Sequence, residues 1–234
     1  TATGLESMAK TTKLERNLKI MLDEIKKNGE KPWHYGFLCD CYYGLGEYDK
    51  TIEYAKKAIT SGIKLVGQEN NVYMRLISSL VFLVIDEKDI LEEINNAICK
   101  FPDLPDFYMD KAIILFKQKY YLEAENNFLT VMDKYNNNKS DLLTNTMDGK
   151  IYLLYAYLGE IYLLKNDISK ALEFFIESAL KNKYYEISFL NLYEIIKEQP
   201  VEDIISFLNT LYDDSERDLQ FLCNALKKKQ VDKT

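Results

Sequence analysis

The sequence predicts an all-α protein in which helical hairpins stack into a right-handed α-α superhelix. Three observations predict this fold class. The 234 residues include only 9 Gly and 4 Pro, too few for a β sandwich with many tight turns. Hydrophobic residues make up 47% of the chain and aromatic residues 13%, which is enough to build a core. A pattern of bulky and small residues at helical spacing also returns several times along the chain.

Residues 35–58 form the clearest repeat unit. Bulky residues at helical spacing occupy its first half, Gly46 provides a turn, and a second amphipathic run extends from Thr51 to Ala58. This order returns in residues 155–175, and each unit predicts two antiparallel helices. Both units place a small residue directly after Leu and three residues before Tyr: Leu38, Cys39 and Tyr42 in the first, Leu158, Gly159 and Tyr162 in the second.

Two weaker units lie between these, in residues 74–102 and 108–131, and their small residues are expected at Ser78 and Ala112. Insertions at 62–71 and 136–149 lengthen two of the junctions and are predicted to be loops. The residues that open the core stripe of each second helix therefore recur at about 34 residues or somewhat more. These residues are Thr51, Ile90, Ala124 and Ala171.

This pattern resembles the tetratricopeptide repeat, a pair of antiparallel helices about 34 residues long. The resemblance implies stacking, because one helix pair cannot bury its apolar face alone. The small residue of each first helix would let a neighbouring helix approach closely. Large residues such as Phe128 and Phe175 would fill the gaps between layers. About four to five helix pairs are expected.

Partial units are expected at both ends. Residues 14–25 carry one apolar helix face and stop at Asn28-Gly29, as the second half of a repeat would. Residues 187–212 predict a degenerate fifth pair. Ser215 then opens a C-terminal capping helix with Leu219, Leu222, Cys223 and Leu226 on one stripe. We expect residues 1–10 to be a disordered leader or a remnant of expression, and residues 11–234 to form the repeat domain.

The charge balance is acidic. Thirty Lys and Arg against 37 Asp and Glu give a formal net charge of −7. This balance argues against a sequence-independent grip on nucleic-acid phosphate, so no nucleic-acid partner is expected. The longest apolar stretches, 80–85 and 151–158, fall far short of the roughly 20 residues that cross a bilayer. No signal segment opens the chain, and a cytoplasmic protein without membrane contact is expected.

Residues that could carry chemistry are scarce. The four cysteines, Cys39, Cys41, Cys99 and Cys223, are irregularly placed, which indicates buried reduced thiols and not disulfides. Cys39 and Cys41 would point to nearly opposite sides of a helix, and the only histidine, His34, is expected at a helix surface or partly packed. A zinc site therefore lacks ligands. No nucleophile, phosphate-binding or metalloprotease motif occurs, so no catalytic site, metal or cofactor is expected.

In tetratricopeptide proteins the first helices line a concave groove that usually holds an extended or helical peptide. Carrying this pattern over places four residues of each first helix in the groove. They are Trp33, Gly36, Asp40 and Tyr43; Val72, Arg75, Ser79 and Phe82; Asp106, Met109, Ile113 and Phe116; and Leu153, Ala156, Glu160 and Leu163.

Eight of these form the candidate binding set. Gly36 and Asp40 stand where the chaperone-binding members need cations and amides, so a clamp for a peptide's terminal carboxylate is not expected. Two interpretations stay open: several of these residues are core between layers, or they line an aromatic trough for a peptide, another domain or a second copy of the chain. The set is Trp33, Asp40, Tyr43, Arg75, Phe82, Met109, Phe116 and Glu160.

Three segments carry a more specific resemblance, namely KLERNL at 13–18, CYYGLGEY at 41–48 and FPDLPDFY at 101–108. They are similar to the tetratricopeptide tail of bacterial family-2 glycosyltransferases, a group that includes the bacterial peptide S-glycosyltransferases. The resemblance covers nearly all of residues 11–230. In that family the tail follows a nucleotide-sugar-binding α/β domain. The 234 residues contain neither that domain nor its Asp-x-Asp motif, so they are not expected to transfer sugar themselves.

Two functional hypotheses follow. In the first, the chain is the non-catalytic tail of such a glycosyltransferase. It would then bind a peptide or protein acceptor, contact the neighbouring catalytic domain, or form a homodimer. In the alternative, it is a free-standing adaptor that binds a peptide or a partner protein.

Overall fold

The computed structural model describes residues 2–62, 69–137 and 146–231. Within these ranges every regular element is a helix and no strand occurs, which confirms the all-α fold class. The α-helices are α1 (Ala2–Asn28), α2 (Pro32–Leu45), α3 (Tyr48–Ser61), α4 (Glu69–Phe82), α5 (Glu87–Lys100), α6 (Pro105–Lys117), α7 (Tyr121–Asn137), α8 (Ile151–Leu164), α9 (Ile168–Lys181), α10 (Glu186–Ile196), α11 (Val201–Leu208) and α12 (Glu216–Val231), with a 3-10 turn η1 (Met147–Gly149) before α8.

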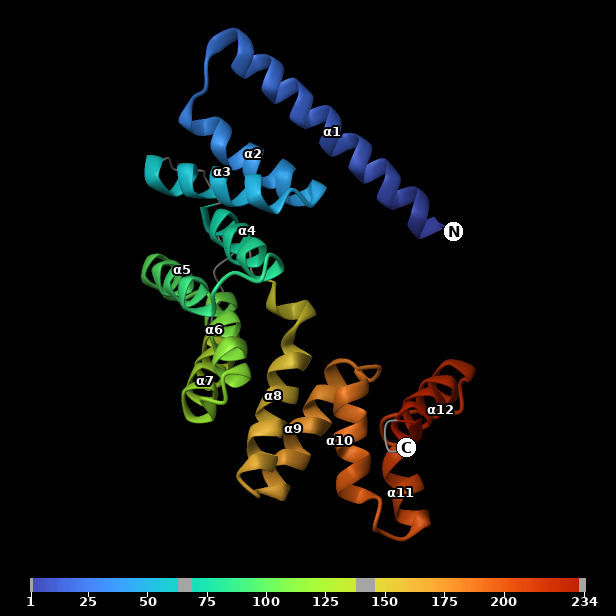
Figure 1. The fold of residues 1–234 in the computed structure, drawn as a ribbon. Coiled ribbons are helices and arrows are strands. Elements are labelled where there is room, and N and C mark those ends of the chain that lie inside the picture. Colours follow the sequence, from blue (N-terminus) through green and yellow to red (C-terminus); the bar gives the residue numbers. More distant parts are fainter. Residues whose placement is uncertain (1, 63–68, 138–145, 232–234) are drawn as a thin grey trace.

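The helices follow one another along an arc (Figure 1). Over the described ranges, α1 packs on α2 at one end, and four helix pairs follow, from α2/α3 to α8/α9. α10 packs on α9 ahead of the short α11, and α12 closes the other end. This arrangement matches the predicted pairs, half repeat and capping helix. The core is divided accordingly into clusters that succeed one another, from α2–α6, through α6–α9 and α8–α11, to α10–α12. Each hairpin therefore shelters its neighbours, and no single centre exists.

A left-handed residue ends the first helix of four hairpins. The residue that follows the left-handed one donates its backbone N–H to a carbonyl oxygen near the end of the helix. That carbonyl has no partner within the helix itself. These matching bonds align the four hairpins independently of their sequences. The left-handed residues are Gly46, Val84, Lys119 and Asn166 (φ 78°, 52°, 66° and 60°). The bonds are Glu47 to Tyr42, Ile85 to Leu80, Tyr120 to Leu115 and Asp167 to Tyr162, at 2.9–3.1 Å.

This alignment corrects the register predicted for α4. Leu80, and not Val81, is the equivalent of Tyr42, so the small-residue position falls on Ile77 instead of Ser78. The cause is a longer turn, because α5 begins three residues after Val84 whereas α3 begins two residues after Gly46. Leu80 is accordingly buried and Val81 is 46% exposed.

Close packing inside a hairpin is clearest at Gly159. A Cβ added there would lie 2.7 Å from Cε1 of Phe175, whose ring is fully buried. The small residue predicted on α8 therefore admits the large residue predicted on α9. The insertion before α8 lies mostly outside the described residues, but its last part packs inward, since Met147 is fully buried.

Two contacts hold α1 on α2. His34 is fully buried, its Nδ1 accepts the Lys31 backbone N–H (2.8 Å), and its Nε2 contacts the Glu24 carboxylate. Because Nδ1 accepts, the proton of the neutral ring is on Nε2, which donates to Glu24. His34 was expected at a helix surface or partly packed, and its full burial corrects that expectation. Nearer the other end of α2, Leu14 covers Gly44. The helix also continues back to Ala2, through the segment expected to be a leader.

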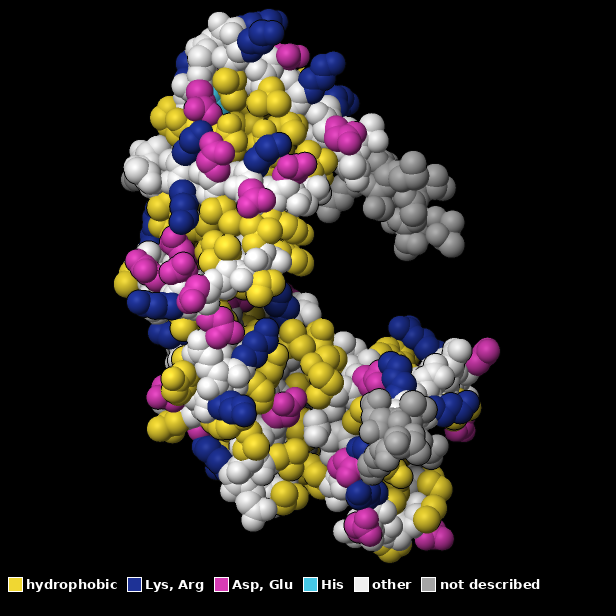
Figure 2. Space-filling view, in the orientation of Figure 1, with side chains coloured by type: hydrophobic (Ala, Val, Ile, Leu, Met, Phe, Trp, Pro, Cys, Tyr) yellow, Lys and Arg dark blue, Asp and Glu magenta, His cyan; other side chains and the backbone are white. Residues whose placement is uncertain are grey.

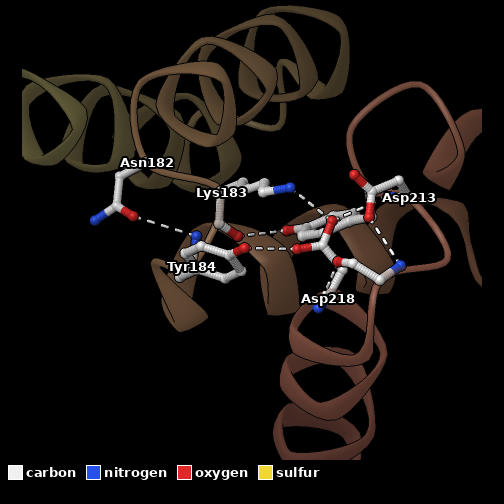
Figure 3. A network of polar contacts seen from close by, with 7 residues as sticks. Asn182, Lys183, Tyr184, Asp213 and Asp218 are labelled. Carbon is white, nitrogen blue, oxygen red and sulfur yellow. Dashed lines mark hydrogen bonds and ion pairs between the residues drawn. The ribbon is translucent and has the colours of Figure 1, made fainter.

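Asp218 joins the C-terminal cap to the rest of the solenoid (Figure 3). This fully buried carboxylate accepts from Lys183 Nζ (2.6 Å), Tyr184 OH (2.7 Å) and the Asp213 backbone N–H (2.9 Å). Burial works to raise the pKa of Asp218, but these donors outweigh it and bring the pKa to about 2. As predicted, Ser215 caps α12, because its Oγ accepts the Asp218 amide at 3.3 Å.

The cap differs from its prediction in two ways. Leu219 and Cys223 are exposed, and the helix buries Asp218 and Ala225 instead. The predicted end of the fifth pair at Tyr212 is not helical either, because α11 stops at Leu208.

The cysteines are all free. Cys39 and Cys41 are buried as expected, and burial raises the pKa of Cys39 to about 12. Cys99 and Cys223 are exposed, which corrects the prediction for them.

Candidate functional site

The inner side of the arc is formed by first helices. α2, α4 and α8 border the opening, whereas α5 and α7 lie on the outer side (Figure 1). Apolar side chains gather where the end of α4 faces that opening (Figure 2). Exposed or half-buried residues of α2, α4, α6 and α8 make up this side, and their surface is called the concave face below. Its members are Trp33, Phe37, Asp40 and Tyr43 on α2; Arg75, Ser78, Val81 and Phe82 on α4; Asp110, Ile113, Phe116 and Lys117 on α6; and Leu153, Tyr157, Glu160 and Leu164 on α8.

A pocket of about 220 Å³ opens between α4 and α6 on this face, and is called the α4/α6 pocket. Val81 and Phe82 form one apolar wall, and Ile113 lies on the other. Asp110 and Lys117 are the two charged residues of the lining. The remaining lining residues are Ile77, Ser78 and Ile114.

Aromatic rings stiffen the face. Phe82 stacks on Tyr48, with centroids 4.7 Å apart and an interplanar angle of 4°, yet it stays 60% exposed. The Phe116 ring packs against the Tyr157 ring of the next repeat, with ring centroids 5.0 Å apart. Rings held in this way offer contact area at a small entropic cost, which suits recognition of a partner.

One charged pair crosses from α2 to α4. Arg75 donates to Asp40 at 3.2 Å, and its guanidinium lies 4.4 Å from the centroid of the Tyr43 ring. Both charges are therefore compensated within the solenoid.

Two further carboxyls lack such compensation. Asp110 and Glu160 are half-buried and make no hydrogen bond or ion pair with the described residues. Burial raises the pKa of Asp110 to about 6; Asp106 reinforces the rise and Lys150 opposes it. Burial likewise raises the pKa of Glu160. Titratable groups shifted by burial in a concave site are candidate functional groups.

Comparison with solved structures decides the fold. A crystal structure of MamA superimposes with a TM-score of 0.56 at 16% identity, covering 76% of this chain and 94% of MamA. YrrB, described as a TPR protein with an unusual peptide-binding site, gives 0.56 at 16% identity, over 78% and 84%. PilF of Pseudomonas aeruginosa gives 0.55 at 16%, over 85% and 84%. The chain has the tetratricopeptide-repeat fold.

Sequence comparison adds nothing to this result, since no family model and no curated protein matches the chain. In the described ranges, no helix combines the length and apolar character that a bilayer crossing requires. The same ranges bring no three His, Cys, Asp or Glu side chains together in a way that could hold a metal ion.

Of the eight candidate residues, seven keep part of their side-chain surface exposed. Met109 does not, because it is 2% exposed and belongs to the core between α6, α7 and α8. It is therefore an interior residue. In the wider set, the interlayer interpretation holds for Gly36, Val72, Ser79, Asp106 and Ala156, which are all buried.

The groove pattern expected from the sequence missed seven members of this face, namely Phe37, Ser78, Val81, Asp110, Lys117, Tyr157 and Leu164. Phe37 and Asp110 occupy one equivalent position, the same that Arg75 holds in α4, but this position was not in the carried-over pattern. Val81 was displaced by the error in the α4 register. A search for every residue one turn from an expected groove residue would have found Phe37 and Asp110.

Proposed function

We propose that the chain is a scaffold for protein interaction whose concave face binds an extended segment of a partner protein. The observation that carries this proposal is the α4/α6 pocket beside Phe82, since a 60% exposed aromatic ring is held rigidly at its rim. The neighbour YrrB is described as having a peptide-binding site, which supports a similar use of this fold.

The test selects peptides that bind the purified chain from a random dodecapeptide library displayed on phage. Trp33→Ala combined with Phe82→Ala removes two exposed rings from the concave face and should reduce recovery of selected peptides at least tenfold. The matched control, Leu122→Ala combined with Leu180→Ala, removes side chains that are 64% and 61% exposed on second helices. Equal recovery by the two double variants would contradict the assignment of the concave face.

The finer hypothesis, a tail of a bacterial family-2 glycosyltransferase, rests on the resemblance of residues 13–18, 41–48 and 101–108. In it the same face engages the acceptor, or the chain builds a homodimer. An immunoblot of the source cells tests it: a band far above 27.4 kDa favours a longer enzyme, and a band at that mass favours the free-standing adaptor. Light scattering of the purified chain tests the homodimer. We place either protein in the cytoplasm, since all four cysteines are unpaired.

A further inference from the structure

Asp110 occupies an unusual place in the α4/α6 pocket. It is the equivalent of Arg75, which is neutralised by Asp40, and of the uncharged Phe37. The pocket that it lines also has the apolar Val81 and Phe82 of α4 in its wall. A carboxylate against an apolar wall loses hydration, and this costs free energy unless a cation or donor replaces the water.

The charged groups around Asp110 do not provide a cation or donor bonded to its carboxylate. Asp106, one turn before it on α6, uses Oδ1 to accept the Thr146 amide at 3.1 Å. Lys150 precedes α8 and Lys117 lines the same pocket, but neither forms an ion pair with Asp110. The α4 residues of the lining, Ile77, Ser78, Val81 and Phe82, carry no charge.

We propose that the α4/α6 pocket receives a Lys or Arg side chain of the bound segment, whose cationic group pairs with Asp110. The methylene stem would lie along Val81, Phe82 and Ile113, as long basic side chains do on apolar surface. A volume of about 220 Å³ corresponds to about seven waters at about 30 Å³ each. One such side chain therefore fits with some solvent. This inference rests on the proposed function, because it names the chemistry of the segment that the concave face binds.

The pairing should depend on pH. With a pKa of about 6, Asp110 is ionised at pH 7.5 and largely protonated at pH 5. Lys and Arg keep their charge over this range, so the attraction grows as the pH rises.

The experiment varies one residue of the peptide and measures how tightly each peptide pool binds. Dodecapeptide pools carry Arg, Lys, norleucine or Glu at a fixed central position and random residues elsewhere, and binding to the full chain is measured by fluorescence polarisation at pH 7.5 and pH 5. We expect the Arg and Lys pools to bind at least fivefold more tightly than the norleucine pool at pH 7.5, and this preference to shrink at pH 5. Asp110→Asn should abolish the preference at both pH values.

The matched control is Glu173→Gln, which removes one negative charge from an exposed position of α9 and should keep the preference. Thermal melting of both variants confirms that they fold. A pool preference that Asp110→Asn leaves intact would overturn the inference. Binding that is lost in Phe82→Ala but shows no preference for Arg or Lys would overturn the inference and leave the proposed function standing. Absence of binding by every pool would overturn both.

Discussion

Single residues decide how closely the hairpins pack, and Gly159 is the tightest example. Any side chain there meets the buried Phe175 ring within 3 Å. Because the Phe175 ring is fully buried in a close-packed core, a side chain at position 159 must displace the ring or the backbone. The same dependence on one small residue explains why the order bulky–small–aromatic was readable in the sequence.

Gly159→Leu should lower the free energy of unfolding by more than about 2 kcal/mol through overpacking. Gly159→Ala should also destabilise, by a smaller amount. Thermal or urea unfolding measures both. Gly149→Ala is the control, because a Cβ at Gly149 meets nothing within 4 Å. Melting of Gly159→Leu at the wild-type temperature would contradict the packing.

Asp110 should weaken the fold at neutral pH. Its pKa in the folded protein, about 6, is above the ordinary 3.8, so the folded state holds the proton more tightly. The stabilisation from that proton is complete below about pH 4 and is lost as the pH rises through 6. At 1.36 kcal/mol for each pKa unit, the loss is about 2–3 kcal/mol.

Asp110→Asn should remove this loss. Urea unfolding of wild type and variant at pH 4.5 and pH 7.5 provides the measurement, and the variant should gain stability relative to wild type as the pH rises. Parallel changes in the two proteins would show that the carboxyl is not buried as described.

At the scale of the element, the turn between α4 and α5 is strained. Val84 is a β-branched residue at φ 52°, a backbone conformation that suits Gly or Asn, and it is 87% exposed. Two of the three equivalent turns use Gly46 and Asn166 there, and the third uses Lys119, which is not β-branched.

Val84→Asn should therefore raise the free energy of unfolding by about 1 kcal/mol. Val201→Asn is the control, since Val201 is similarly exposed, at 64%, but has no positive φ. Its effect should stay within about 0.5 kcal/mol. Urea midpoints compare the two, and an unchanged midpoint for Val84→Asn would indicate that the turn carries no strain.

α12 should loosen selectively in acid. Its anchor, Asp218, has a lowered pKa of about 2, so the stabilisation is present above pH 4 and is lost as the pH falls through 2. Hydrogen exchange should show α12 and the 183–185 junction losing protection first. Asp218→Asn should produce the same local loss at pH 7, whereas Asp213→Asn, at an exposed position, should produce less. Uniform loss along the chain would contradict a local anchor.

For the whole molecule, the succession of core clusters predicts unfolding by parts. Phe189 packs against Tyr212 and Phe221 in the cluster of α10–α12. Phe189→Ala should cost about 3–5 kcal/mol locally. It should lower exchange protection in α10–α12 while α2–α5 stay protected. Phe107→Ala, in the α2–α6 cluster, should give the reverse pattern. Equal loss in both ends would indicate one cooperative core.

The architecture was predictable because each hairpin repeats a local pattern. The order around Tyr42 and Tyr162 depends on contacts within one unit, so spacing reveals it. The α4 register was not predictable, since Leu80 and Val81 are both apolar and the small Ser78 lies three residues before Val81, whereas the position equivalent to Cys39 holds the large Ile77. Only the extra turn residue before Glu87 distinguishes them, and it shows in the backbone bonds.

The candidate site was less predictable because burial there depends on distant segments. Met109 and His34 look equally accessible in the sequence, but the α8 layer covers one and Glu24 contacts the other. Asp110 is one of 37 acidic residues. Nothing in its local sequence shows that it lines one pocket with Val81 and Phe82.

The attachment of α1 has a mechanical consequence. The helix has 27 residues and is about 40 Å long at about 1.5 Å per residue. Its grip on α2 lies at Glu24 and Leu14, so about 18 Å projects beyond Leu14 along the edge of the opening (Figure 1). A tilt of about 10° at that grip would sweep the free end through about 3 Å. A small rotation at the contact between α1 and α2 would therefore change the width of the opening that α1 borders.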